Sequence, residues 1–247
     1  MEVEERTSVD KDLIIEALYH GTFSVNGQFV SGSNYTFLAD LTHNTLSFQV
    51  VYKPVRGEQP LWDFPHGSLA RREVAAYLVS ETLGWELVPP TVLRKDGPLG
   101  AGSVQYYVEH DPNDHYFNFE EEERQRLRPV VVFDLIINNA DRKGGHILRD
   151  EHDHVWLIDH GLCFHAEEKL RTVVWDFSGE EIPDDMMAAV SQLTDQLKEG
   201  GKLHSALQTY LRPAEITAMQ ARTRRLCEMG RFPAPPASRR SYPWPPV

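Results

Sequence analysis

Alternating hydrophobic and polar positions dominate the first part of the chain and predict β-strands. Between residues 13 and 55, β-branched and aromatic residues recur at strand spacing. Turn residues separate these runs. Asn26-Gly27 is the strongest hairpin signal, and residues 31–34 and 42–44 provide two further links. The pattern predicts an antiparallel sheet built from short strands.

A helical period replaces this alternation at residues 68–83, where Ser68 can cap the start and Gly84 ends the run. Residues 88–93 and 103–108 then predict two more strands, joined by a turn. The remaining helices are expected late in the chain, at 120–123 onward, 130–137, 184–197, 203–211 and 213–229. Strands that precede a group of helices predict an α+β chain.

The stretch from residue 133 to 164 interrupts these regular patterns. A helical run stops after residue 137, and a polar loop follows at 141–146. Short apolar runs at 147–148 and 155–158 then predict a β-hairpin. This hairpin would return the chain to the polar loop.

Two aspartates, Asp141 and Asp159, would therefore meet at one end of the hairpin although they are far apart in sequence. Arg142 and Lys143 stand beside the first of them. Such a set suits phosphoryl transfer, in which one carboxylate orients a hydroxyl and another holds magnesium. The residues alone thus suit a site for phosphoryl transfer.

Composition narrows the class of partner. The chain has 247 residues and a formal net charge of -12, which would repel nucleic acid or an anionic membrane surface. No apolar run approaches the roughly 20 residues that span a bilayer. The two cysteines form no disulfide framework, and no signal peptide is recognisable in the acidic start. We expect a cytoplasmic protein without a transmembrane segment and without nucleic acid as a partner.

The stretch resembles the catalytic and metal-binding loops of the phosphatidylinositol 3-/4-kinase-like branch of the protein-kinase-like fold. In that branch Asp-Arg-His-x-x-Asn-Ile-Leu is followed by Ile-Asp-Phe-Gly, and here DRKGGHIL is followed by IDHG. The whole chain is similar to a bacterial, mainly actinobacterial, family of this kinase-like type without a settled substrate. The resemblance implies a two-lobed fold, with an antiparallel β-rich N-lobe at 1–110 and a small helical C-lobe at 111–230. A Pro-rich tail at 231–247 is expected to be extended, and either poorly ordered or laid across the surface.

By this resemblance, Asp141 is the catalytic aspartate, Arg142 is its arginine and Asp159 is the metal-binding aspartate. Lys143, the third candidate catalytic residue, stands where the wider pattern has His. His146 stands where the family pattern has a second metal-binding Asn. A neutral imidazole can ligate a metal, but it is a softer ligand than an amide oxygen. The implied cofactors are ATP and Mg²⁺ or Mn²⁺.

The N-lobe residues implied to bind the nucleotide fall into three groups. Ser33 and Asn34 lie in a loop that would cover the phosphates, and Lys53 ends a strand that would deliver its ammonium to them. Glu73, on the following helix, would pair with Lys53. The adenine base would bind along the segment that contains Gln105, Tyr107 and Val108.

The expected activity is ATP-dependent, metal-assisted phosphoryl transfer to the hydroxyl of an unidentified protein or small molecule. Two alternatives stay open. His146 favours a nucleotide-binding pseudokinase that regulates a partner without turnover, whereas the intact Lys53, Asp141 and Asp159 argue against it. The same fold could also transfer adenylate instead of phosphate.

Overall fold

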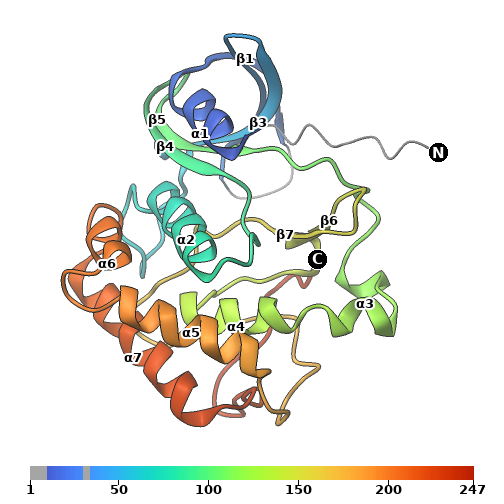
Figure 1. Ribbon diagram of the computed structural model, residues 1–247. Helices are drawn as coiled ribbons and strands as arrows, with labels where there is room; N and C mark the ends of the chain where they lie inside the picture. Colours follow the sequence, from blue (N-terminus) through green and yellow to red (C-terminus); the bar gives the residue numbers. More distant parts are fainter. Residues whose placement is uncertain (1–9, 30–33) are drawn as a thin grey trace. The chain divides into compact units, whose positions relative to one another are not determined.

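The computed structural model describes residues 10–29 and 34–247, and it divides the chain into two compact units (Figure 1). The strand-rich unit comprises Met1–Gln59 and Pro90–Tyr107, and the helical unit comprises Pro60–Pro89 and Val108–Val247. Among the described residues, no helix has both the length and the apolar character needed to cross a membrane.

The strand-rich unit is one antiparallel sheet in the order β1-β2-β3-β5-β4. Its strands are β1 Thr22–Phe29, β2 Thr36–His43, β3 Leu46–Pro54, β4 Thr91–Gly97 and β5 Gly100–Tyr106. The helix α1, Lys11–His20, packs on β2, β4 and β5. Its residues Ala17 and Leu18 join Leu41, Val50 and Tyr52 in a fully buried core. The predicted antiparallel sheet is therefore present.

Two expectations for this unit are wrong. The range 13–55 was expected to form strands, but it begins inside α1, where Asp10 caps the first turn by accepting a hydrogen bond from the Asp12 N–H at 3.0 Å. Asn26-Gly27, expected as a hairpin turn, lies inside β1, where the register with β2 shifts between Val25 and Gly27. The extra residue makes a β-bulge. Strand β1 continues to Phe29, and its antiparallel partner β2 begins at Thr36.

The helical unit contains six α-helices among the described residues. They are α2 Leu69–Leu83, α3 Glu121–Gln125, α4 Arg128–Ile137, α5 Asp184–Gln196, α6 Lys202–Leu207 and α7 Pro213–Met229. The predicted hairpin is present as β6, Ile147–Arg149, and β7, Val155–Leu157. Helices α5 and α7 lie side by side, and α2 contacts both α5 and α6 (Figure 1).

A buried ion pair joins α2 to α7. The guanidinium of Arg72 lies 2.5 Å from the Glu215 carboxylate, and both side chains are almost completely buried. Arg72 also donates to the carbonyl oxygen of Cys163, in the stretch after the hairpin. Arg72 therefore fixes α2 against the part of the chain that carries the candidate chemistry.

Ser68 stands before the first residue of α2 and was expected to cap the helix with its side chain. Its hydroxyl donates to the Pro65 carbonyl oxygen instead.

Candidate active site in the helical unit

The loop that carries Asp141 begins where α4 ends. Asn138 adopts a left-handed conformation with φ of 53°, which stops the helix after Ile137. Its side-chain amide donates to the carbonyl oxygens of His165 and Glu167, at 2.9 and 2.7 Å. The start of the loop is thus tied to the segment that follows the hairpin.

Arg142 anchors this loop from inside the unit. Its side chain is fully buried and forms an ion pair with the equally buried Asp134 of α4, at 3.1 Å. It also donates to the carbonyl oxygens of His146, at 3.2 Å, and Ile158, at 3.0 Å. Arg142 therefore holds together the two loops that carry Asp141 and Asp159. The sequence interpretation counted Arg142 among the catalytic residues, and that role stays a prediction; in the structure its side chain has no exposed surface.

Asp141 lies beside Lys143, whose ammonium is 3.5 Å from the carboxylate, and both side chains are about one quarter exposed or less, at 25% and 21%. Burial raises the pKa of Asp141 to about 6; Lys143 lowers it, Asp159 raises it, and Arg171 lowers it by a smaller amount. A carboxylate with this pKa is ionised at neutral pH and is still basic enough to accept a proton.

His146 contacts both of the loops that carry the two aspartates. Its Nδ1 lies 3.1 Å from the Asp141 carbonyl oxygen, which can only accept, so Nδ1 carries the hydrogen. In the neutral ring the lone pair then sits on Nε2, 3.4 Å from Oδ2 of Asp159. Metal-binding histidines are usually oriented in this way by a carbonyl oxygen on the other nitrogen.

The distance between Nε2 of His146 and Oδ2 of Asp159 is suitable for two ligands of one cation. Two ligand atoms at about 2.1 Å from a cation and at a right angle are about 3 Å apart, which is close to the observed 3.4 Å between His146 and Asp159. Within the described residues, no group of three or more His, Cys, Asp or Glu side chains could hold a metal ion. Phosphate and water oxygens would have to complete the coordination, as is common for Mg²⁺.

Glu73 of α2 supports the loop that carries Asp159. Its side chain is 3% exposed, and its carboxylate accepts a hydrogen bond of 2.9 Å from the backbone N–H of His160. Asp159 itself has a φ of 62°, a conformation that non-glycine residues seldom adopt outside functional sites and turns. Glu73 thus holds the backbone at His160, the residue that directly follows the strained Asp159. Its expected pairing with Lys53 stays a prediction, since Lys53 belongs to the other unit.

The predicted phosphate-binding residues lie in the strand-rich unit. Lys53 is near the end of β3, opposite Ser103 of β5. The side-chain oxygen of Asn34 accepts a 2.7 Å hydrogen bond from the Gln59 N–H. Ser33 lies outside the described residues.

The predicted adenine-binding segment crosses the boundary between the units. The Gln105 side chain is buried and donates to the Thr91 hydroxyl at 2.8 Å. The Tyr107 N–H donates to the Gln49 carbonyl oxygen at 3.1 Å. The ring of His110 lies 2.8 Å from the Val108 carbonyl oxygen. Binding of a base by this segment stays a prediction.

Arg171 is a residue of the site that the sequence interpretation did not find. Its backbone N–H donates to the Asn139 carbonyl oxygen at 2.8 Å, and its own carbonyl oxygen accepts from the Arg142 N–H at 3.0 Å. These bonds bring Arg171 close enough to Asp141 to lower the pKa of that carboxyl group. No sequence signal pointed to Arg171, because it lies in an irregular segment without periodicity.

Comparison with known proteins shows the family and the fold of the chain. Residues 67–218, which are more than half of the chain, match the family Phosphatidylinositol 3- and 4-kinase. The chain belongs to the phosphatidylinositol 3- and 4-kinase family. The chain is 42% identical in sequence to Protein Rv2133c of Mycobacterium tuberculosis, and the match covers 92% of the chain and 93% of that protein. It is 30% identical to phosphatidylinositol 4-kinase gamma 4 of Oryza sativa subsp. japonica, over 44% of the chain but only 22% of the plant kinase.

Solved structures show the same fold at low identity. The Golgi casein kinase with Mn/ADP bound gives a TM-score of 0.58 at 14% identity, covering 88% of this chain and 74% of that one. The Helicobacter pylori proinflammatory kinase CtkA gives 0.54 at 12% identity, covering 87% and 94%. The predicted family and the kinase-like α+β fold class are both confirmed.

Proposed function

We propose that the protein is an ATP-dependent phosphotransferase that uses a divalent cation and acts on the hydroxyl group of a protein or a small molecule. The observation that supports this most directly is the placement of the His146 ring. It lies between the Asp141 backbone and the Asp159 carboxylate, inside one compact unit. A purely structural loop has no need to bring the Asp141 and Asp159 carboxylates close enough for Asp159 to raise the pKa of Asp141.

Asp141 is the proposed general base. Its pKa of about 6 leaves it ionised at neutral pH, and its side chain is partly exposed, so an acceptor hydroxyl can reach it. Lys143 and Arg171 place positive charge near the Asp141 carboxylate. Positive charge there favours the phosphoryl oxygens, on which negative charge is spread during transfer.

Asp159 and His146 are the proposed protein ligands of the cation, Mg²⁺ or Mn²⁺. When bound, the cation neutralises negative charge on the phosphate oxygens of ATP. Lys53, Asn34 and Ser33 are proposed to contact the phosphates on the strength of the family pattern. The structures with the same fold include one with Mn/ADP bound, which supports a nucleotide and a divalent cation as ligands of this fold.

The acceptor is not specified by the relatives. Several plant proteins with partial similarity are named phosphatidylinositol 4-kinases, but the chain covers only part of their length. The net charge of -12 opposes stable binding to an anionic membrane surface. We therefore keep a protein or small-molecule hydroxyl as the proposed acceptor.

The test uses ATP labelled separately on its α- and γ-phosphates, with the wild type and two variants. We expect transfer of the γ-label to an acceptor, loss of metal-dependent nucleotide binding in Asp159→Ala, and loss of transfer with nucleotide binding retained in Asp141→Ala. Asp195→Ala is the control, since the Asp195 side chain is 66% exposed on the surface. Transfer of the α-label would instead establish adenylation. Nucleotide binding without any transfer would establish a pseudokinase.

A further inference from the structure

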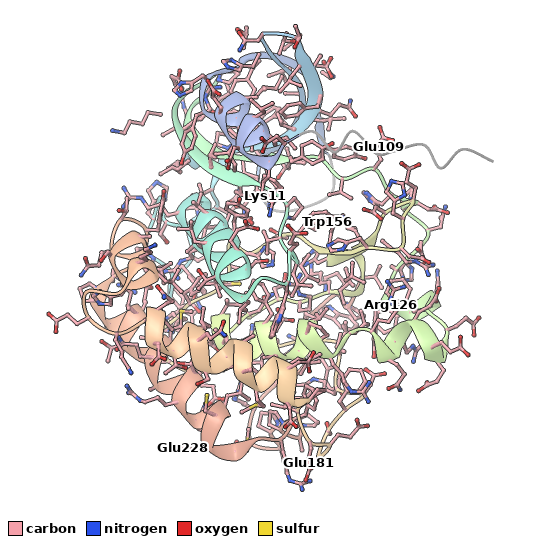
Figure 2. The ribbon with its side chains drawn as sticks, viewed as in Figure 1. Lys11, Glu109, Arg126, Trp156, Glu181 and Glu228 are labelled. Atoms are coloured by element: carbon pink, nitrogen blue, oxygen red, sulfur yellow. The ribbon has the colours of Figure 1, made fainter. Side chains whose placement is uncertain are left out.

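The Pro-rich tail, residues 231–247, is anchored to the segment that follows the hairpin. Arg231 pairs with Glu181, labelled in Figure 2, through a backbone bridge and an ion pair of 2.5 Å. The next residue, Phe232, is 2% exposed and exchanges backbone hydrogen bonds with Glu180, at 3.0 Å, and Gly179, at 2.9 Å. The first part of the tail thus extends the packed structure of the helical unit.

The middle of the tail makes a second set of bonds further back along the same segment. Arg239 donates to the Leu170 carbonyl oxygen at 2.9 Å. The carbonyl oxygen of Ser241 accepts from the Thr172 N–H, at 3.1 Å, and from the indole N–H of Trp175, at 3.3 Å. Ser241 is 6% exposed. These contacts lie immediately beside Arg171, the residue close to Asp141.

The end of the tail reaches the catalytic loop itself. The backbone N–H of Gly144 donates to the Pro246 carbonyl oxygen at 2.8 Å. A Cβ atom at Gly144 would lie 2.9 Å from the Phe117 ring and 3.6 Å from that same carbonyl oxygen. Only glycine allows the Phe117 ring to approach this closely, whereas the distance to the tail is an ordinary van der Waals contact. Gly145 also lies within van der Waals contact of the tail, since a Cβ atom there would be 3.9 Å from the Val247 side chain.

The loop and the tail also share a partner. Arg142 donates its backbone N–H to the Arg171 carbonyl oxygen, at 3.0 Å, and its carbonyl oxygen accepts from the Val173 N–H, at 3.1 Å. Thr172, between these two residues, is the one that donates to Ser241 of the tail. Residues 171–173 are therefore held between the catalytic loop on one side and the tail on the other.

We infer that residues 239–246 are a positioning strap for the catalytic loop, an inference that rests on the proposed phosphotransferase function. The strap holds Gly144 directly and holds Arg171 through Thr172, so it fixes groups on both sides of Asp141. It acts through backbone hydrogen bonds and leaves the Asp141 and Lys143 side chains 25% and 21% exposed. A segment that blocked the acceptor would be expected to cover these two groups.

The test compares the wild type with a variant that lacks residues 243–247, which loses the bond to Gly144 but keeps Arg239 and Ser241. We expect kcat to fall about 10- to 100-fold, because small misplacements of catalytic groups have costs of that size. KM for ATP should stay within about twofold, since the loop positions the acceptor side. Trp244→Ala is the matched control, because it removes a side chain that is 76% exposed and leaves the strap backbone in place.

Hydrogen exchange of the 138–146 peptide provides a readout that does not depend on activity. We expect faster exchange in the deletion variant and wild-type exchange in Trp244→Ala. Trp175→Phe removes one donor to Ser241 while keeping most of the ring volume, and should give a smaller change in the same direction. It serves in place of the deletion if the deletion does not fold.

Two results would overturn the inference. Unchanged exchange at 138–146 in both the deletion and Trp175→Phe would show that the strap does not order the loop. A rise in kcat on deletion would show that the tail inhibits. An inactive wild type would refute the proposed function alone, since the exchange experiment would still decide whether the strap orders the loop.

Discussion

Replacing the ionised Asp141 by a neutral side chain of the same shape should stabilise the protein. Burial raises the pKa of Asp141 to about 6, against 3.8 for an ordinary aspartate. The folded state therefore opposes the charge that the proposed reaction needs. Asp141→Asn removes that charge and keeps the volume and the hydrogen bond from the Asp141 N–H to the Asn139 side chain.

The magnitude and its pH dependence follow from the two pKa values. Between pH 3.8 and about 6 the folded state binds more protons at Asp141 than the unfolded chain does, so the free energy of unfolding falls as pH rises through this window. At 1.36 kcal/mol per pH unit, the full loss is about 3 kcal/mol, as an upper figure for a partly exposed group. The free energy of unfolding of Asp141→Asn should not fall in this window. It should equal that of the wild type below about pH 4 and exceed it by the full amount above about pH 6.

The assay is urea unfolding of both proteins at a series of pH values, without nucleotide and with a chelator. Asp150 provides a control, because its pKa is shifted in the opposite direction from that of Asp141. Burial alone would raise its pKa, but hydrogen bonds from the Trp156 indole and the backbone N–H groups of His154 and His152 outweigh burial and lower it. Asp150→Asn should therefore destabilise the protein at neutral pH, and this loss should shrink on acidification.

Equal stability of Asp141→Asn and the wild type across the whole pH range would refute the reasoning. A gain in the free energy of unfolding that is largest at low pH would also refute it, because burial does not destabilise a carboxyl group that is already protonated. Higher stability of Asp141→Asn at neutral pH, together with loss of phosphoryl transfer, would show that the charge on Asp141 serves activity and lowers stability.

Three further predictions concern the surroundings of this group. Glu215→Ala should lower the free energy of unfolding by about 3–5 kcal/mol, because it leaves the buried guanidinium of Arg72 without its carboxylate. Arg171→Gln should raise the pKa of Asp141 further and move the acidic limb of the kcat/KM profile to higher pH. His146→Asn should increase affinity for Mg²⁺ relative to Mn²⁺ in calorimetric titrations with ATP, since it replaces an imidazole by an amide oxygen.

Each of these has its own control or contrary result. Arg212→Ala removes the more exposed partner of the same carboxylate, with a side chain 57% exposed, and should cost no more than about 1 kcal/mol. An acidic limb that does not move in Arg171→Gln would mean that another group limits the rate. An unchanged metal preference in His146→Asn would remove that residue from the cation site.

The sequence predicted the elements whose ends carry strong local signals. Helix α7 runs from Pro213 to Met229 as expected, because proline is favoured at a helix start and Gly230 takes the left-handed conformation that ends the helix. The hairpin β6–β7 formed as predicted because two apolar runs flank a polar turn. This hairpin is what returns Asp159 to the loop of Asp141, so the central pair of the site was accessible from local pattern and family resemblance together.

The misses have a common physical origin in tertiary structure. Asn26-Gly27 has the composition of a tight turn, yet the pairing of β1 with β2 accommodates it as a bulge. Arg142 directly follows Asp141 in the sequence, and nothing local reveals that its side chain points into the unit toward Asp134. Arg171 reaches Asp141 only through backbone pairing between segments far apart in the chain.

The burial of Arg142 with Asp134 explains how the loops of Asp141 and Asp159 can be fixed while the Asp141 carboxylate stays partly exposed. A buried ion pair is a weak source of net stability, and a well-packed apolar pair often does as well. An apolar pair, however, could not donate to the carbonyl oxygens of His146 and Ile158, which lie in the two different loops. The guanidinium therefore contributes geometry more than stability. It holds the loops of Asp141 and Asp159 from behind, through their backbone, and leaves both of these carboxylates outside the buried pair.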